Sequence, residues 1–436
     1  MTFIPEIEQK SIQEQVSFQY GKLKELLHYL QERSPFYQQL FARHSIDINA
    51  IQTWEDLQSL PTTSKEDIQH HNWDFLCVPS SAIREYTATS GTLGNAVVIA
   101  LTHNDLLRLS YNEYLSFNCI GASAADIFQL MLTLDRQFMA GIAYYNGLSQ
   151  LGAASIRTGP GLPAMQWDTI QRMGTTGLVA VPSFLKKMIG HAAATGISPA
   201  ASTVKKVLAI GESLRDDNLA PNSLMQSIQS QWNIELYSTY AATEMQTAFT
   251  ECHAGQGGHH HPELIIAELL DDEGRQVPPG ERGEVTITTL GVEGMPLLRY
   301  RTGDICRAYY EPCSCGRTTM RLGPVLGRKQ QMIKFKGTTL YPPVLFDVLN
   351  QVSVIQEYVV EVSTDADGQD LLHLYLNSSL ETEACNALLR PLLQHKWRVL
   401  PLLTYCSAEE IRQMQFPANS RKQIKFIDKR STYVHS

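Results

Sequence analysis

GLVAVPS at residues 177–183 and VKKVLAIG at residues 204–211 are short apolar runs on either side of a helical stretch. The same alternation occurs earlier in the chain, where VVIAL at residues 97–101 and IFQLMLTL at residues 127–134 are also apolar runs between helical stretches. Short apolar runs that alternate with helices indicate βα layers around a largely parallel sheet. We therefore expect an α/β fold for this part of the chain.

The first residues of the chain, up to about residue 45, carry a helical pattern. Leu23, Leu26, Leu27 and Leu30 recur at helical spacing within GKLKELLHYLQ. We therefore expect helices ahead of the βα layers.

A second pattern begins near Gly327. It comprises an expected strand, helix, two strands, helix and strand, in the segments MIKFK, PPVLFDVLNQ, EYVVEVS, LLHLYLN, ETEACNALLRPLL and RVLPLLTYC. The order βαββαβ is that of a ferredoxin-like α+β domain. The sequence therefore predicts a large N-terminal domain of residues 1–326 and a small C-terminal domain of residues 327–436.

Length and composition limit the class of protein. A chain of 436 residues is too long for one ordinary core, and 43% hydrophobic with 18% charged residues is the balance of a globular protein. A formal net charge of -8 argues against partners such as nucleic acid or an anionic membrane. No apolar run is long enough to span a bilayer, and MTFIPEIEQKS lacks the order of a secretion signal. We expect a cytoplasmic protein whose eight cysteines are thiols or metal ligands.

A loop rich in Gly, Ser and Thr occupies residues 87–95, TATSGTLGN. Such a loop lets backbone N–H groups and hydroxyls approach phosphate oxygens, and its candidate phosphate contacts are Ser90, Gly91, Thr92 and Gly94. The spacing GxxxxGK[ST] of a Walker loop is absent. A β-hairpin turn rich in turn-forming residues is the alternative interpretation.

Further motifs follow this loop in a recognisable order. They are LPTTSKED at residues 60–67, the turn Gly211-Glu212-Ser213, YAATE at 240–244, RYRTGD at 299–304, CSCGRT at 313–318, and GRKQQMIK at 327–334 with Gly337. Together with the loop, they resemble the motifs of the phenylacetate–CoA ligase family of adenylate-forming enzymes. The resemblance spans nearly the whole chain, and a set of motifs in one order is more specific than any single motif.

The resemblance assigns roles in binding ATP and Mg²⁺. Glu244 would hold Mg²⁺, a hard cation that prefers carboxylate and phosphate oxygens, Tyr240 would face the adenine, and Asp304 would accept hydrogen bonds from the ribose. Further nucleotide contacts are implied at Gly211, Glu212, Ser213, Ala241, Thr243, Arg328 and Lys334. The alternatives are a solvated carboxylate at Glu244, a core aromatic at Tyr240, a turn residue at Asp304 and a surface arginine at Arg328.

The C-terminal tail, PANSRKQIKFID at residues 417–428, resembles the closing motif of the same family. This alignment places Lys422 at the position of the catalytic lysine, whose ammonium would offset charge developing between the carboxylate and the α-phosphate. An ordinary tail lysine is the alternative, since Arg421 replaces the family's glycine. Two other departures are Asn95 in place of the phosphate-loop lysine and Gln330 in place of the hinge aspartate. The hinge itself needs dihedral freedom rather than charge.

A second constellation has the chemistry of a metal site. Three thiols and one imidazole would form a closed tetrahedral Zn²⁺ site, from Cys252, His259, Cys313 and Cys315. The family pattern favours His259 and puts Glu268 at a matching downstream position, while His260 and His261 remain rivals. His253 adjoins Cys252 and is less suitable. Four protein ligands leave no open position, so we expect a structural site; free buried thiols and surface histidines are the alternative.

The resemblance implies an ATP-dependent acyl-CoA ligase that forms acyl-AMP and transfers the acyl group to CoA, with ATP, Mg²⁺, CoA and Zn²⁺ as cofactors. Its partners would be a small, aryl or arylalkyl carboxylic acid and a second copy of the chain in a homodimer. Aromatic candidates for the acid pocket, which would otherwise be core residues, are Phe138, Tyr144, Tyr145 and Trp167. Two other functions stay open: acyl transfer to a carrier protein or an amine, and a non-catalytic nucleotide-binding zinc protein.

Overall fold

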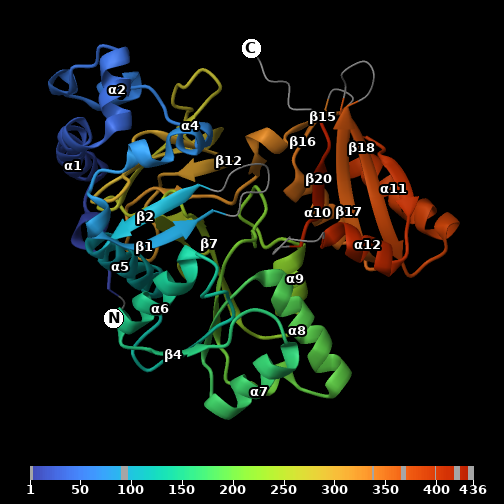
Figure 1. The fold of residues 1–436 in the computed structure, drawn as a ribbon. Coiled ribbons are helices and arrows are strands. Elements are labelled where there is room, and N and C mark those ends of the chain that lie inside the picture. The colour runs from blue at the N-terminus through green and yellow to red at the C-terminus, as the bar shows by residue number, and fades with distance from the viewer. Residues whose placement is uncertain are drawn as a thin grey trace. The chain divides into compact units, whose positions relative to one another are not determined.

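The computed structural model describes residues 3–89, 97–335, 338–364, 370–397, 399–416 and 423–430, with backbone alone for residues 334, 335, 338 and 339. The chain forms two compact units, Met1–Val325 and Leu326–Ser436 (Figure 1). Among the described residues, no helix is both long and apolar enough to cross a membrane.

The predicted βα alternation is confirmed in the larger unit. Five strands pair in parallel in the order β4-β3-β5-β6-β7, namely Ala154–Arg157, Ile127–Leu130, Gly177–Ala180, Lys206–Ala209 and Glu235–Ala242. The two apolar runs of residues 177–211 contain β5 and β6, and α8 connects them.

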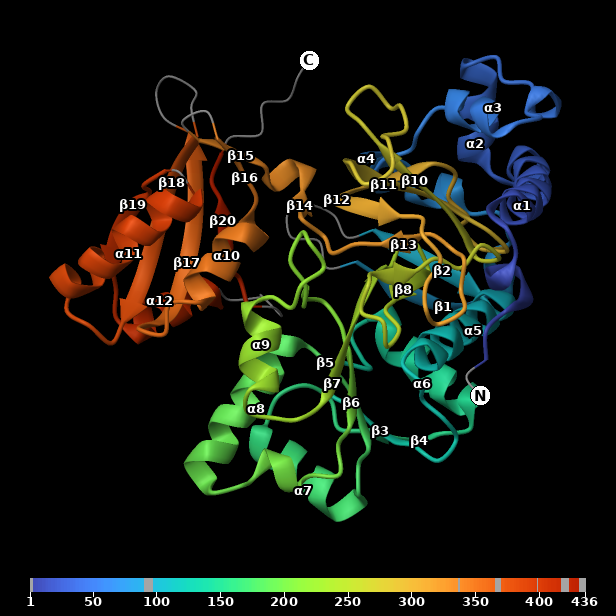
Figure 2. The same cartoon turned by 180° about the vertical axis from the view of Figure 1, so that it is seen from behind.

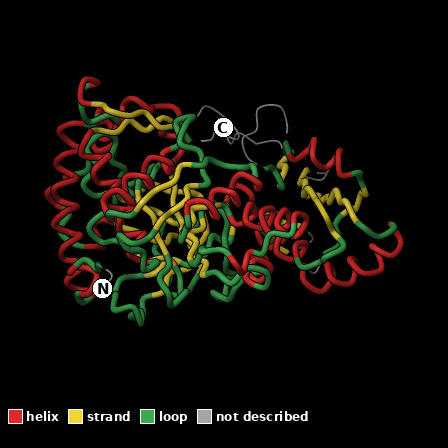
Figure 3. Tube along the Cα trace, turned by 90° about the horizontal axis from the view of Figure 1, so that it is seen from below, coloured by secondary structure: helices red, strands yellow, loops and turns green. Residues whose placement is uncertain are grey.

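Helices cover both faces of this parallel part, as Figure 2 shows. On one face lie α7 (Pro163–Met173), α8 (Pro182–Thr195) and α9 (Ser223–Gln229), and on the other α5 (His103–Cys119) and α6 (Met139–Leu151). Successive side chains of a strand point to opposite faces. Accordingly Leu178 packs with α7–α9, whereas its neighbour Val179 packs with α5 and α6. Figure 3 shows the strands running between helices.

Beyond β7 the sheet is antiparallel, so the expected largely parallel sheet is correct only up to β7. The order continues β8-β9-β13-β12-β11-β10, namely Thr247–Thr250, Gly258–His259, Arg321–Leu322, Tyr300–Tyr309, Arg282–Thr289 and Ile265–Leu270. The change from parallel to antiparallel pairing follows from the length of the connection between the strands. Residues 243–246 are the whole link between β7 and β8, and a parallel crossover needs a dozen or more residues.

An N-terminal layer precedes the sheet. It contains the 3₁₀ helix η1 and the helices α1 to α4, at Glu6–Gln9, Ile12–Arg33, Pro35–Arg43, Trp54–Ser59 and Lys65–His71. The four leucines at helical spacing are buried in α1, as their spacing predicts. VVIAL forms β2 (Val98–Thr102), but this strand pairs antiparallel with β1 (Ile83–Ala88) in a separate two-stranded sheet and not in the parallel sheet.

The six predicted strands and helices of the smaller unit occur in the predicted order. The elements of this unit are β14 to β16 (Gly327–Arg328, Ile333–Phe335, Thr338–Leu340), α10 (Pro342–Asn350), β17 (Ile355–Thr364), β18 (Asp370–Ser378), α11 (Thr382–Trp397), β19 (Leu402–Tyr405), α12 (Ala408–Gln415) and β20 (Phe426–Asp428). Of these, β14, β16, α12 and β20 are additional to the prediction. The sheet order is β19-β18-β17-β20. The first predicted strand, β15, instead pairs with β16 in a hairpin, and the place beside β17 is taken by β20.

Contacts within the smaller unit tie its last segment to earlier elements. The Ile424 N–H donates to the carbonyl oxygen of Gln415 at 2.9 Å, and the Gln423 side-chain amide donates to Gln415 Oε1 at 2.7 Å. Arg430 pairs with Asp428 and with Asp370. Residues 423 and 424, which precede β20, are therefore held against Gln415 at the end of α12.

Candidate functional site

Two predicted motifs lie at the carboxyl edge of the parallel strands. The Gly211–Ser213 turn follows β6, and residues 240–244 end β7 and begin the turn after it. Because β6 and β7 are parallel neighbours, with Ala209 opposite Ser238, both segments arrive at the same edge. In open α/β sheets this edge is where ligands bind.

The Gly211–Ser213 turn is held by hydrogen bonds to its surroundings. Gly211 has φ of +76°, a conformation that glycine adopts without strain. The Glu212 carboxylate accepts from the Ser183 N–H at 2.7 Å, at the start of α8. The Ser213 hydroxyl donates to the Arg215 carbonyl at 3.0 Å, and Asn222 donates to the Ser213 carbonyl at 2.8 Å. The side chains of Glu212 and Ser213 thus fix the shape of the turn.

Tyr240 and Asp304 form one hydrogen-bonded unit. The tyrosine hydroxyl donates to Asp304 Oδ2 at 2.9 Å. Burial, and next the charge of Asp304, raise the pKa of Tyr240 well above its ordinary value. Asp304 lies in a bulge of β12: Thr286 pairs with Arg301 and Glu284 with Ile305, so three residues of β12 stand opposite one of β11.

Glu244 lies beside Tyr300, within a group of carboxylates. Glu244 is 8% exposed and lies close enough to Tyr300 for its charge to act on the tyrosine hydroxyl. Burial first, and then the charges of Glu244, Glu66 and Asp304, raise the pKa of Tyr300. A concentration of carboxylates suits a hard divalent cation. Glu66 and Tyr300 were missed as site residues, although both lie within quoted motifs.

The LPTTSKED segment reaches this site by pairing with β12. The Thr63 N–H donates to the Arg299 carbonyl at 3.0 Å, and the Arg301 N–H donates to the Thr63 carbonyl at 2.8 Å. The buried Arg299 guanidinium forms two hydrogen bonds to Glu268, at 3.1 and 3.0 Å. Glu268, which the family pattern puts at a matching downstream position, therefore pairs with Arg299, and it is not among the described residues of the cysteine–histidine cluster.

The predicted metal ligands are brought together. One ligand atom each of Cys252, His259, Cys313 and Cys315 lies within 4.8 Å of the others. The Sγ atoms of Cys252 and Cys313 are 3.6 Å apart, and Cys315 Sγ is 3.4 Å from His259 Nε2. A tetrahedral Zn²⁺ with ordinary bond lengths has S···S and S···N edges of about 3.8 and 3.6 Å. The four side chains therefore fit a zinc ion.

The four candidate histidines at positions 253 and 259–261 differ in their surroundings. His260 Nε2 lies 2.6 Å from the Ile265 carbonyl oxygen, and burial lowers its pKa to about 4. His261 Nδ1 lies 2.5 Å from Glu8 Oε1, while His253 is exposed. Of these histidines, His259 alone belongs to the cluster found among the described residues.

Buried charge surrounds the cluster. Hydrogen bonds from Cys252 and, after the opposing effect of burial, from His259 hold the pKa of the Cys315 thiol well below its ordinary value. Arg317 Nη1 donates to Cys315 Sγ at 3.6 Å, and its Nε donates to Glu8 Oε2 at 2.6 Å. The N-terminal segment thereby contacts the CSCGRT loop through a fully buried carboxylate.

Some predicted residues cannot be placed at this site. Ser90, Gly91, Thr92 and Gly94 of the phosphate loop, as well as Asn95 and Lys422, lie outside the described residues. Arg328 and Lys334 belong to the smaller unit, in β14 and β15. Tyr144 and Trp167 are core residues on opposite faces of the parallel sheet, so they do not line one pocket.

The sequence matches the AMP-binding enzyme family over residues 57–294. It is 28% identical over 368 residues to a phenylacetate-coenzyme A ligase of Thermus thermophilus, covering 83% of this chain and 81% of that protein. A phenylacetate-coenzyme A ligase of Pseudomonas putida is 24% identical over 386 residues, covering 86% and 82%.

Solved structures of adenylate-forming enzymes share the fold. The 2-hydroxyisobutyryl-CoA ligase in the postadenylation state, in complex with 2-HIB-AMP, has a TM-score of 0.83 at 22% identity, covering 98% of this chain and 92% of that chain. The amide bond synthetase McbA from Marinactinospora thermotolerans has a TM-score of 0.55 at 16% identity, covering 75% and 65%.

Proposed function

Because the chain belongs to the AMP-binding enzyme family, we propose that it is an ATP-dependent acyl-CoA ligase that activates a carboxylic acid as acyl-AMP and transfers the acyl group to CoA. The observation that carries the proposal is the hydrogen bond between Tyr240 and Asp304 at the carboxyl edge of the parallel strands, with Glu244 in the turn that follows Tyr240. Relatives that match more than four-fifths of the chain are phenylacetate-coenzyme A ligases, which supports CoA as the acceptor.

In the first half-reaction, a carboxylate oxygen attacks the α-phosphorus of ATP, and pyrophosphate leaves. Tyr240 faces the adenine, Asp304 accepts hydrogen bonds from the ribose, and Glu244 holds Mg²⁺, which offsets phosphate charge. The remaining contacts come from the Gly211–Ser213 turn, Ala241, Thr243 and the phosphate-loop residues Ser90, Gly91, Thr92 and Gly94. Lys422 offsets the charge that develops between the two reacting anions.

In the second half-reaction, the CoA thiolate attacks the acyl carbon of the mixed anhydride, and AMP leaves. We assign the change between the two steps to rotation of the C-terminal domain, residues 327–436, about residues 327–330. Rotation withdraws Lys422, and Arg328 and Lys334 belong to the moving side of the hinge. Enclosing the acyl-AMP between the steps keeps water from hydrolysing it.

The cluster of Cys252, His259, Cys313 and Cys315 is proposed to hold a structural Zn²⁺. Its support is the closeness of the four ligand atoms, which all lie within 4.8 Å of one another, and the preference of thiolates for zinc. Four protein ligands leave no position for a substrate, so the ion would link the loop after β8 to the CSCGRT loop.

Location and assembly are part of the same proposal. We place the protein in the cytoplasm, because the cysteines of the described residues are free thiols, as a reducing compartment maintains them. We also propose a homodimer, following the family resemblance. Sedimentation equilibrium of the purified protein distinguishes the dimer from a monomer.

The deciding experiment is a pyrophosphate-exchange screen over aromatic and aliphatic acids, followed by addition of CoA to each positive case. Exchange followed by thioester formation is the expected result. Exchange without thioester formation would instead favour acyl transfer to an amine or a carrier protein. The similarity in fold to an amide bond synthetase is in line with this alternative. Absence of exchange with every acid would favour a non-catalytic nucleotide-binding protein.

A further inference from the structure

A buried ion pair joins the Gly211–Ser213 turn to the cysteine–histidine cluster. Arg215 Nε donates to Glu251 Oε1 at 2.6 Å, and the two side chains are only 11% and 4% exposed. Arg215 lies two residues after the turn, and Glu251 immediately precedes the ligand Cys252. The ion pair therefore connects two segments that are distant in the sequence. One belongs to the proposed nucleotide site and the other to the proposed metal site.

Glu251 also reaches the strand that carries Tyr240. Its Oε2 accepts from the Ser238 N–H at 3.3 Å, two residues before Tyr240 on β7. Glu251 also immediately precedes Cys252. One residue thus connects Arg215, strand β7 and the loop that carries two of the four cluster ligands.

Arg215 lies directly against the Cys252 turn. The Gly255 N–H donates to the Cys252 carbonyl at 3.0 Å and closes this turn. A Cβ atom added at Gly255 would lie 2.2 Å from Arg215 Nη2, so the guanidinium occupies the space in which any other residue would place its side chain. Arg215 Nη1 also donates to the Leu219 carbonyl at 3.1 Å, which fixes the guanidinium on its other side.

We propose that Arg215 and Glu251 are positioning residues that couple the order of the Cys252 turn to the shape of the Gly211–Ser213 turn. This inference rests on the nucleotide role proposed for that turn and on the metal proposed for the cluster. Neither residue belongs to the reacting groups assigned above. Their effect is on how well the nucleotide is bound, because the turn loses its fixed geometry when the pair is broken.

The coupling has a reciprocal consequence. If metal in the cluster orders the Cys252 turn and the pair transmits that order, metal strengthens nucleotide binding, and nucleotide strengthens retention of the metal by the same factor. A cluster that only stabilised the fold would lack this second effect.

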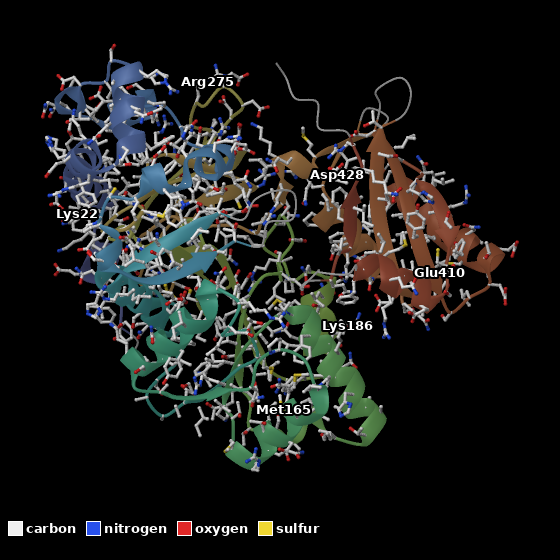
Figure 4. The ribbon with its side chains drawn as sticks, in the orientation of Figure 1. Lys22, Met165, Lys186, Arg275, Glu410 and Asp428 are labelled. Atoms are coloured by element: carbon white, nitrogen blue, oxygen red, sulfur yellow. The ribbon has the colours of Figure 1, made fainter. Side chains whose placement is uncertain are left out.

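The first test is AMP binding by calorimetry to the metal-loaded protein. Arg215→Met is expected to weaken AMP binding by about 5- to 10-fold, within the usual range of coupling between sites. Arg215→Lys keeps the charge and should recover part of the loss. The control is Arg275→Met, which breaks an exposed pair with Asp271 on the surface (Figure 4) and should leave binding unchanged. Equal AMP binding by Arg215→Met and the parent overturns the proposal.

A second variant displaces Arg215 without changing either charge. Gly255→Ala places a methyl group against the guanidinium at a residue with φ of +60°. Gly274→Ala is its matched control, since Gly274 has φ of +80° and open space around the added atom. Weaker AMP binding in Gly255→Ala than in Gly274→Ala is expected. Equal effects of the two substitutions contradict the proposed role of Arg215.

The third test combines metal removal with the variant. Chelation should weaken AMP binding by the parent protein and add little to the loss already present in Arg215→Met, because both changes disrupt the same connection. Independent, additive losses overturn the coupling. If the parent protein holds no metal, the zinc proposal fails, but the first two experiments still test whether Arg215 supports AMP binding. If the parent binds no AMP or ATP, the proposed function itself fails.

Discussion

The hydroxyl of Tyr240 donates a 2.9 Å hydrogen bond to Asp304, across 64 residues of sequence and from β7 to β12. The aromatic ring proposed for adenine and the carboxylate proposed for ribose therefore hold each other in place. The parallel strand β7 and the antiparallel strand β12 each supply one half of this nucleotide contact.

Tyr240→Phe tests that contact. The substitution keeps the ring and removes the donor, which leaves the buried Asp304 carboxylate with one hydrogen bond fewer. A hydrogen bond to a charged group contributes about 1.5–3 kcal/mol, so the KM for ATP should rise by about 10-fold or more while kcat changes less. Steady-state kinetics with varied ATP measure the two constants. Unchanged KM would show that the hydroxyl does not support nucleotide binding.

Lys422→Ala should abolish adenylation and leave thioester formation from supplied acyl-AMP largely intact. In its proposed role the lysine acts on charge that develops only in the first half-reaction, and removing such a group costs about 100- to 1000-fold in rate. The matched control is Lys429→Ala, because Lys429 is an exposed lysine paired with Glu361. Equal losses in both half-reactions would contradict the assignment.

Glu244→Gln should raise the Mg²⁺ concentration needed for half-maximal rate and slow adenylation. The amide keeps the shape of the side chain but lacks the charge that a hard cation requires. Magnesium titrations of pyrophosphate exchange measure this, with the exposed Glu273→Gln as control. Superimposable titrations of Glu244→Gln and the parent would exclude Glu244 as a ligand.

The purified protein should contain one zinc ion per chain by elemental analysis. Cys313→Ser should lower both zinc content and melting temperature, because a structural ion stabilises the folded state to which it binds. His253→Ala and His260→Ala should leave zinc content unchanged, since neither imidazole lies in the cluster. Absence of metal from protein purified without chelator would end this proposal.

A buried carboxyl on α5 should make stability depend on pH. Burial raises the pKa of Glu113 to about 8 from an ordinary value of 4.5. Between these values the unfolded chain has released a proton that the folded chain keeps, so stability falls as pH rises from about 4.5 to 8. The full loss is on the order of 5 kcal/mol. Glu113→Gln removes this titration. The free energy of unfolding, measured by urea denaturation, should therefore differ less between pH 5 and pH 8 in the variant than in the parent protein.

The sequence predicted those parts of the fold that depend on local pattern. The β5–α8–β6 alternation and the four buried leucines of α1 followed from periodicity. The antiparallel part of the sheet did not, because β11 is buried over nearly its whole length although its sequence, RGEVTITT, is largely polar, and neither property indicates the direction of its neighbours. β20 was missed since three residues after a polar segment give no periodic signal, although pairing with β17 completes the sheet.

The candidate site, like the fold, could be predicted from the sequence only in part. Motif order pointed to Tyr240, Glu244 and Asp304, and the structure adds the hydrogen bond between Tyr240 and Asp304. No local feature of the sequence indicates that Glu8 pairs with Arg317, or that Arg215 pairs with Glu251, since each bond joins distant segments. The family pattern favoured His259 and left His260 and His261 as rivals, and the structure brings His259 alone of these three into the cluster of the described residues.

The hydrogen bonds of residues 423 and 424 to Gln415 have a consequence for the rate of the change between the two half-reactions. Residues 423 and 424 move with Gln415, and the withdrawal proposed for Lys422 is assigned to rotation of this domain. We therefore expect the change between the half-reactions on the microsecond to millisecond scale of a domain movement, rather than the picoseconds to nanoseconds of a rotamer change. Movement of a domain through water meets viscous drag. Where this movement limits turnover, thioester formation should slow in proportion to added glycerol or sucrose, whereas a reaction limited by bond making would be indifferent to the solvent's viscosity.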